Sequence, residues 1–179
     1  MSPEPMTTPK QSQKKPYSEQ SDAEKVISNW RKTRGLFKRG EFSVAILRAA
    51  TTAELMTNLA IRHELVQSKS LPMAFVDHLL VWANGISGKF HNLLLPVLEG
   101  AANYQSTKEL SAAMKKVNEE RNRVAHRGEF KKRSTAHDAL VAAHKYISGL
   151  AATYAPTIQL LPPETSHSQL QATRANARN

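Results

Sequence analysis

The segment from residue 41 to 67 constrains the fold most, because its apolar residues recur at helical spacing over about seven turns. Residues three and four positions apart lie on one side of an α-helix, so this spacing predicts a single long helix. Its apolar face consists of Phe42, Ala45, Ile46, Ala49, Ala53, Met56, Leu59 and Ala60. The many alanines on that face favour close approach of neighbouring helices. The segment therefore predicts a helical bundle organised around one long helix.

Helical signals continue through most of the remaining chain. No hairpin signal flanked by alternating strands is found, and no internal repeat, so the sequence predicts an all-α, up-and-down helical bundle of about five to six helices. We expect a disordered N-terminal tail over residues 1–20, a helical domain over 21–155 and a flexible C-terminal tail over 156–179. The further helices are expected at 21–38 from the capping box Ser21-x-x-Glu24, at 75–83, at 89–98, at 106–128 from a second box Ser106-x-x-Glu109, and at 134–155 with Ser134 as the cap.

The composition limits the chemistry that the chain can carry. Forty per cent of the residues are apolar, which is enough for a folded core. The chain has no cysteine, which excludes disulfides, thiolate nucleophiles and the usual zinc sites, and no histidine pair has metal-ligand spacing. We therefore expect neither a metal nor another cofactor. No run of about 18 apolar residues and no secretory signal is present, so we expect a cytoplasmic protein that does not enter a membrane.

The charge is strongly positive and clustered. Lysines and arginines number 25 against 15 acidic residues, a formal net charge of +10, and a surface of this kind attracts phosphate backbones. The alternative is a solvated basic face without a partner. Aromatic residues are sparse around the clusters, which gives no support for base stacking on an aromatic platform. One cluster comprises Arg31, Lys32, Arg34, Lys38 and Arg39, and the other comprises Arg121, Arg123, Arg127, Lys131, Lys132 and Arg133.

The second cluster includes the stretch from Arg121 to Gly128, at the end of the helix expected over 106–128. Arg121 occupies a position that should continue this helix's apolar stripe, and a guanidinium there requires a compensating partner. At about 100° per residue, Asn122 lies about 100° and His126 about 140° around the helix from Arg121, so all three can line one cleft. We expect Glu54, midway along the long helix, to pair with Arg121 or orient it. The alternatives are that Arg121 forms a structural ion pair, that His126 interacts with the helix dipole, and that Glu54 faces solvent.

The pattern Arg121-Asn122-x-x-x-His126-x-Gly128, late in a small all-α chain, resembles the HEPN superfamily (higher eukaryotes and prokaryotes nucleotide-binding domain). That signature is an arginine, often followed by a polar residue, and then a histidine after four to six intervening residues; here there are four. The resemblance covers about residues 21–155, and the motif is its specific part. It implies a metal-independent endoribonuclease of a prokaryotic toxin–antitoxin or antiviral defence system. It also implies a homodimer in which two motifs face one cleft.

The resemblance also implies roles for individual residues. His126 would act as base or acid, Arg121 would bind phosphate oxygens, and Asn122 would orient the imidazole or hold the phosphate. The expected partners are RNA, a second copy of the chain and an antitoxin or sensor protein. Three other interpretations stay open: a non-catalytic HEPN-like module that binds nucleotide, nucleic acid or a partner protein; a helical regulator that binds DNA; and a purely structural bundle. Glu54 would support the site, and the RNA backbone would be guided by Arg123, Arg127, Lys131 and Lys132.

Overall fold

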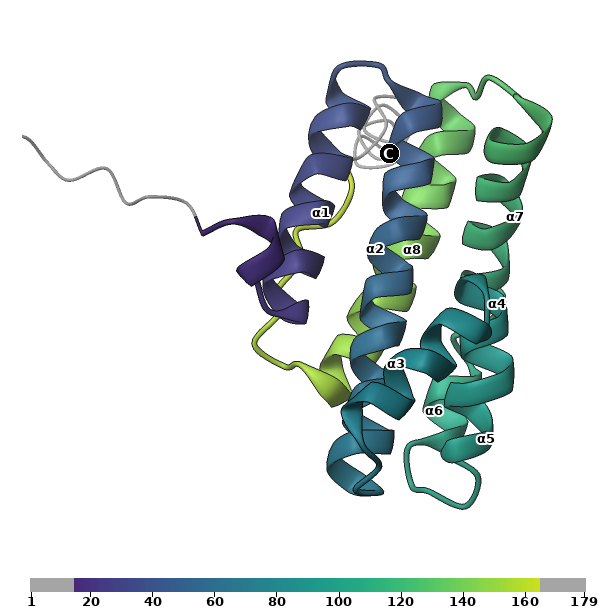
Figure 1. Ribbon diagram of the computed structural model, residues 1–179. Coiled ribbons are helices and arrows are strands. Elements are labelled where there is room, and N and C mark those ends of the chain that lie inside the picture. The colour runs from purple at the N-terminus through teal and green to yellow at the C-terminus, as the bar shows by residue number, and fades with distance from the viewer. Residues whose placement is uncertain (1–14, 165–179) are drawn as a thin grey trace, which may run out of the picture.

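The computed structural model describes residues 15–164, and within that range the chain forms helices and no strands (Figure 1). The predicted all-α bundle of five to six helices is confirmed. Six helices form it when each continuous run counts once, beside the short α6. The elements are η1 (Tyr17–Glu19), α1 (Asp22–Lys38), α2 (Phe42–Arg62) continued by the π-helical η2 (His63–Ser68), α3 (Met73–Trp82), the run α4 (Gly85–Lys89), η3 (Phe90–Leu94) and α5 (Leu95–Val97), then α6 (Tyr104–Lys108), α7 (Ser111–Arg127) and α8 (Arg133–Tyr154).

The four long helices alternate in direction along the chain (Figure 1). Helices α2 and α8 run parallel to each other, because Ser43 Oγ lies 2.9 Å from Lys131 N near one end and Thr57 Oγ1 lies 2.7 Å from Tyr146 Oη further along. The antiparallel partners α1 and α7 flank this pair. The short helices α3 to α6 return the chain to the end of the bundle from which α7 starts.

The core is built on the alanine-rich face of α2. Ala45, Ala49, Ala53 and Ala60 are all buried, as the close approach inferred from the sequence requires. Helix α8 contributes both small and large side chains to the same core, namely Ala136, Ala139, Leu140, Ala143, Tyr146, Ile147, Leu150 and Ala151. Burial of Tyr146 raises the pKa of its phenol, and the hydroxyl is satisfied by Thr57. Helix α2 is therefore held in the core by these buried faces, and α4 and α7 both pack against it.

The start of α1 and the end of α7 agree with the sequence. The capping box is formed: Glu24 N donates to Ser21 Oγ at 3.2 Å, and Ser21 N donates to Glu24 Oε2 at 2.6 Å. Gly128 ends α7 in the left-handed conformation with φ +64°, which glycine adopts without steric cost. These two local signals were therefore interpreted correctly.

Two other predicted helix starts are wrong. The second capping box is absent, because Ser106 lies inside α6 and its hydroxyl donates to Asn103 O, while α7 begins only at Ser111. Helix α8 begins at Arg133 without a side-chain cap, so Ser134 is already inside the helix.

The predicted tails are wrong where they border the bundle. Ile158 is buried, Trp30 Nε1 donates to Leu161 O at 2.8 Å, and His144 Nε2 lies 3.0 Å from Leu160 O. Residues 156–164 therefore pack along α1 and α8. At the other terminus, Asn29 Nδ2 donates to the hydroxyl of Tyr17 at 3.0 Å. The rest of both expected tails, residues 1–14 and 165–179, lies outside the described residues.

The run Phe42–Ser68 is long and apolar enough to cross a membrane by length and composition alone. In the structure, 56% of the 18-residue apolar window within this run is buried inside the bundle, where α2 packs against α1, α7 and α8. A buried core helix of a soluble protein passes the same test of length and composition.

Candidate functional site

The three motif residues meet near the C-terminal end of α7. Arg121 Nη1 donates to Asn122 Oδ1 at 2.9 Å and lies 2.8 Å from His126 Nε2. A guanidinium can only donate, so His126 Nε2 is the acceptor in this contact. The three side chains therefore meet, with Asn122 contacting the guanidinium rather than the imidazole, but of the three only Arg121 lines a groove, so the single cleft expected for all of them is not found.

Arg121 lines a groove between α2, α4 and α7 with a volume of about 340 Å³. Arg121 and Asn122 are half-buried, whereas His126 is exposed beside the groove. A charged fork and an imidazole are thus open to a ligand from one side. This motif groove is lined by Leu47, Ala50, Thr51, Glu54, Gly85, Ile86, Asn118, Arg121 and Ala125.

The predicted pair between Glu54 and Arg121 is wrong. Glu54 lines the motif groove, but its Oε1 accepts a hydrogen bond from Lys89 Nζ at 2.6 Å. The Lys89 side chain is only 9% exposed, so α4 carries a nearly buried ammonium that needs this carboxylate. Within residues 15–164 Arg121 forms no ion pair, and its charge stays available to an anion in the groove.

The charged residue on the packing stripe of α7 is Glu120, which the sequence interpretation missed. It follows Val117 by three positions and is 8% exposed, whereas Arg121 points toward the groove side. Glu120 Oε2 lies 3.0 Å from Lys131 Nζ, and its Oε1 accepts from Arg123 Nη1 at 3.3 Å. The signal was present, because i+3 continues an apolar stripe as well as i+4 does.

Lys131 is not available to RNA, contrary to the prediction. Its side chain is 7% exposed and lies between Glu120 and Glu129, with Nζ 2.6 Å from Glu129 Oε2. The hydrogen bond to Glu129 raises the pKa of Lys131, and the same bond lowers the pKa of Glu129. Of the other cations that were predicted to bind RNA, Arg123 forms an ion pair with Glu120 at 3.3 Å, while Arg127 and Lys132 are exposed.

The α1–α2 connection and the α7–α8 loop, which lie next to parts of the two basic clusters, are at the same end of the bundle (Figure 1). The first turn of α2 contacts the α7–α8 loop, because Lys131 N donates to Ser43 Oγ at 2.9 Å. The Arg133 guanidinium also stacks 5.0 Å from the centre of the Phe37 ring on α1. This basic end comprises Lys38, Arg39, Arg127, Lys132 and Arg133, of which Lys38 pairs with Glu164 and Arg39 with Glu41.

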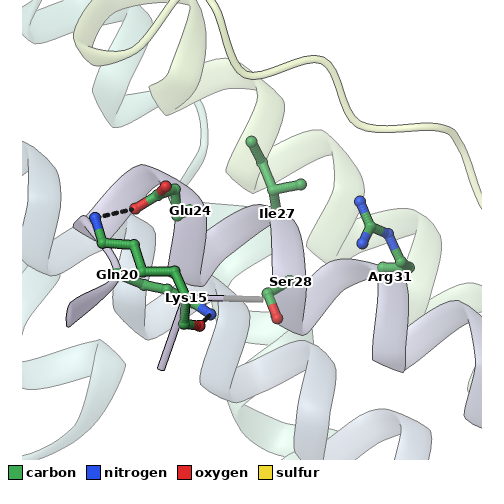
Figure 2. Close-up of a pocket in the computed structure, with 6 residues that line it drawn as sticks. All are labelled: Lys15, Gln20, Glu24, Ile27, Ser28 and Arg31. Atoms are coloured by element: carbon green, nitrogen blue, oxygen red, sulfur yellow. Dashed lines mark hydrogen bonds and ion pairs between the residues drawn. The ribbon is translucent and has the colours of Figure 1, made fainter. Parts of the chain in front are cut away.

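A second hollow of about 230 Å³ lies on α1 and the residues before it (Figure 2). Its carboxylate, Glu24, is held by the helix cap, and the backbone hydrogen bond from Ser21 lowers its pKa. Glu24 Oε2 also lies 3.5 Å from Lys15 Nζ, as the dashed line in Figure 2 marks. The motif groove is the stronger candidate for a catalytic site, because Arg121 lines it and contacts His126 at 2.8 Å, whereas no residue that lines the second hollow contacts an imidazole of the described chain.

The part of the chain that the structure describes contains no group of three histidine, cysteine or acidic residues placed to hold a metal. Comparisons with protein-family models, with curated proteins and with solved structures found no match to this chain. The function therefore has to be argued from the motif groove and its surroundings.

Proposed function

We propose that this chain is a metal-independent endoribonuclease that cleaves RNA through attack by the ribose 2′-hydroxyl, as its HEPN-like motif implies. The observation that carries the proposal is the 2.8 Å contact between Arg121 and His126 beside a groove. A phosphate-binding fork and an imidazole are thus placed within one hydrogen bond of each other. Phosphodiester cleavage at a 2′-hydroxyl needs both groups.

The contact suggests how substrate would start the reaction. In the absence of RNA, Arg121 donates into the Nε2 lone pair of His126 and occupies it. A phosphate entering the motif groove forms stronger, charge-assisted hydrogen bonds with the guanidinium. Arg121 then turns toward the phosphate oxygens, and His126 Nε2 becomes free to accept a proton. Asn122, whose Oδ1 accepts from Arg121, limits how far the guanidinium moves.

The chemical step follows from these positions. His126 Nε2 removes the 2′-hydroxyl proton, the 2′-oxygen bonds to phosphorus, and the bond from phosphorus to the 5′-oxygen breaks. The products are a 2′,3′-cyclic phosphate and a 5′-hydroxyl, whose proton comes from an imidazolium. Arg121 stabilises the charge on the phosphorane. Because one chain contributes one imidazole at this position, we propose that a second copy of the chain supplies the acid.

Helix α3 offers a surface for that second copy. Val81 and Trp82 are each 81% exposed and Phe75 is 51% exposed, so α3 presents apolar side chains to solvent. An exposed apolar patch of this kind marks an interaction surface more often than free surface. Trp82 precedes Gly85, which lines the motif groove, by three residues. A dimer through α3 therefore brings a second chain next to the groove.

The biological setting remains the one that the HEPN resemblance implies. The cytoplasm, a role in toxin–antitoxin or antiviral defence, and an antitoxin or sensor partner are proposals that rest on that resemblance. RNA binding has additional support from the exposed side chains of Arg127 and Lys132 at the basic end. A 2′-hydroxyl nucleophile makes the enzyme specific for RNA over DNA.

The experiment is cleavage of total RNA by the purified protein with a chelator present throughout. Arg121→Ala and His126→Ala should each lower the rate by at least about 100-fold, the scale of a lost general base or charge-stabilising donor. Arg31→Ala and His91→Ala are matched controls, because both residues are exposed and lie outside the motif groove. Both controls should retain the wild-type rate.

Cleavage that persists in His126→Ala would contradict the proposed base. If a folded, dimeric wild-type protein cleaves no RNA but still binds it, the non-catalytic binding module becomes the better account. Dimerisation and folding are checked by sedimentation and circular dichroism on the same samples.

A further inference from the structure

Phe130 is the most exposed large apolar residue in the described chain. Its side chain is 97% accessible to solvent in the loop between α7 and α8. The chain has few aromatic residues, and of the other phenylalanines Phe37 and Phe90 are buried, Phe42 is partly buried and Phe75 is 51% exposed. A phenyl ring left wholly in water gains nothing for folding, so its position needs another explanation.

The loop that carries Phe130 is fixed on both sides. Gly128 turns the chain in the left-handed conformation, and Lys131 N donates to Ser43 Oγ of α2 at 2.9 Å. The side chain of Lys131 is anchored at 3.0 Å to Glu120 beneath the loop. The backbone around Phe130 is therefore held by the bundle, and the ring projects because the fold places it there.

The surroundings of Phe130 are cationic. Arg127 and Lys132 flank it in the sequence with exposed side chains, and the carboxylate of Glu129 is engaged by Lys131. His126 lies four residues before it. A protein-docking surface needs several apolar residues together, as α3 has. A single aromatic ring among phosphate-binding cations instead matches the way proteins hold single-stranded nucleic acid.

We propose that Phe130 forms a subsite that stacks on an unpaired nucleobase, while Arg127 and Lys132 bind the phosphates on either side of that base. The inference rests on the proposed function only for RNA as the ligand, and it adds how the substrate is selected. Bases within a duplex are already stacked and cannot reach the ring, so the protein selects single-stranded RNA. The sequence alone gives no support for base stacking on an aromatic platform, and this proposal differs from that interpretation because Phe130 is exposed among the cations.

The test uses the cleavage-inactive His126→Ala protein and a labelled single-stranded RNA of about a dozen nucleotides, with fluorescence anisotropy as the readout. Phe130→Ala and Phe130→Leu should each weaken binding about tenfold, because stacking on an aromatic ring is lost in both. Phe130→Tyr keeps the ring and should retain the affinity. Binding of a duplex RNA of the same length should not change in any of them.

Equal affinity of Phe130→Ala and its parent for single-stranded RNA overturns the proposal. Retained affinity in Phe130→Leu also overturns it, because the contact would then be a general apolar one and not stacking. A Phe130→Ala protein that binds RNA normally but loses its dimer or a captured protein partner overturns it as well. Absence of cleavage by the wild-type protein, with RNA binding that still depends on Phe130, would instead refute the proposed nuclease and leave the stacking subsite standing. Because Phe130 contributes no buried area, each variant should have the parent's melting temperature.

Discussion

Replacing Lys131 with methionine separates the structural account of this residue from its predicted role in RNA binding. The structure places the ammonium between Glu120 and Glu129, with 7% of the side chain exposed. Methionine keeps most of the side-chain volume and removes the charge. Lys132→Met is the matched control, because the neighbouring lysine is exposed and has no ion pair among the described residues.

The expected loss in the free energy of unfolding follows from the contacts that Glu120 retains in Lys131→Met. Glu120 would keep a nearly buried carboxylate with only Arg123 in contact, at 3.3 Å. An unpaired buried acceptor costs about 1–3 kcal/mol, and a broken buried ion pair about 3–5 kcal/mol. Because Arg123 remains and Glu129 is 40% exposed, we expect a loss of about 2–3 kcal/mol, near the overlap of these ranges. For a chain of this size that lowers the melting temperature by roughly 4–12 °C.

The assay is urea unfolding followed by circular dichroism, with Glu120→Leu completing a double-mutant cycle. The double variant Glu120→Leu/Lys131→Met should be more stable than the sum of the two single losses by at least about 1 kcal/mol. Lys132→Met should change stability by less than about 0.5 kcal/mol. A loss below about 0.5 kcal/mol in Lys131→Met, or effects that simply add, would refute the buried ion pair.

The same variant should change how stability depends on pH. The pKa of Glu129 is lowered in the folded protein by its hydrogen bond from Lys131, so its contribution is present above its ordinary value of 4.5 and is lost as pH falls through the lowered value. The pKa of Lys131 is raised, so its contribution is complete below its ordinary value of 10.5 and is lost as pH rises through the raised value. Lys131→Met should flatten both limbs of the stability profile.

Three further variants test the groove and its walls. Glu54→Gln leaves the Lys89 ammonium without its counter-charge beside the groove, so RNA affinity measured by anisotropy at low salt should rise several-fold; a fall would contradict this. Gly88→Ala puts a methyl group 1.9 Å from a backbone carbonyl oxygen at the end of α3 and should destabilise the fold by at least about 3 kcal/mol. Gly35→Ala, with its nearest atom at 3.5 Å, is the control and should be neutral or stabilising in thermal melts. Trp82→Glu should shift the protein from dimer to monomer in sedimentation, and an unchanged dimer would exclude the α3 interface.

The sequence predicted what depends on local periodicity. The alanine face of α2 and the end of α7 at Gly128 were recognised because side-chain spacing and backbone conformation determine them directly. The meeting of Arg121 with His126 was also predictable, since both lie on one helix of known pitch. Fold class and motif geometry therefore came from the sequence.

Contacts between elements distant in the sequence were not predictable in this way. The partner of Glu54 is Lys89, and nothing in either segment specifies that α4 rather than α7 supplies the cation. Glu120 was missed because two positions can continue one apolar stripe, and only the packing of α7 decides between them. The exposure of Phe130 likewise depends on the hydrogen bond from Lys131 N to Ser43 Oγ, which holds the α7–α8 loop against α2.

The most direct test of the central claim is single-turnover cleavage of an RNA by the wild-type protein, compared with the same RNA carrying one 2′-deoxyribose at the cleavage position. The 2′-hydroxyl mechanism predicts that the all-ribose RNA is cut to a 2′,3′-cyclic phosphate and a 5′-hydroxyl, and that the deoxy-substituted RNA stays intact at that position. Cleavage of the deoxy-substituted bond at a similar rate, or products ending in 5′-phosphate, would contradict the account of Arg121 and His126 given above.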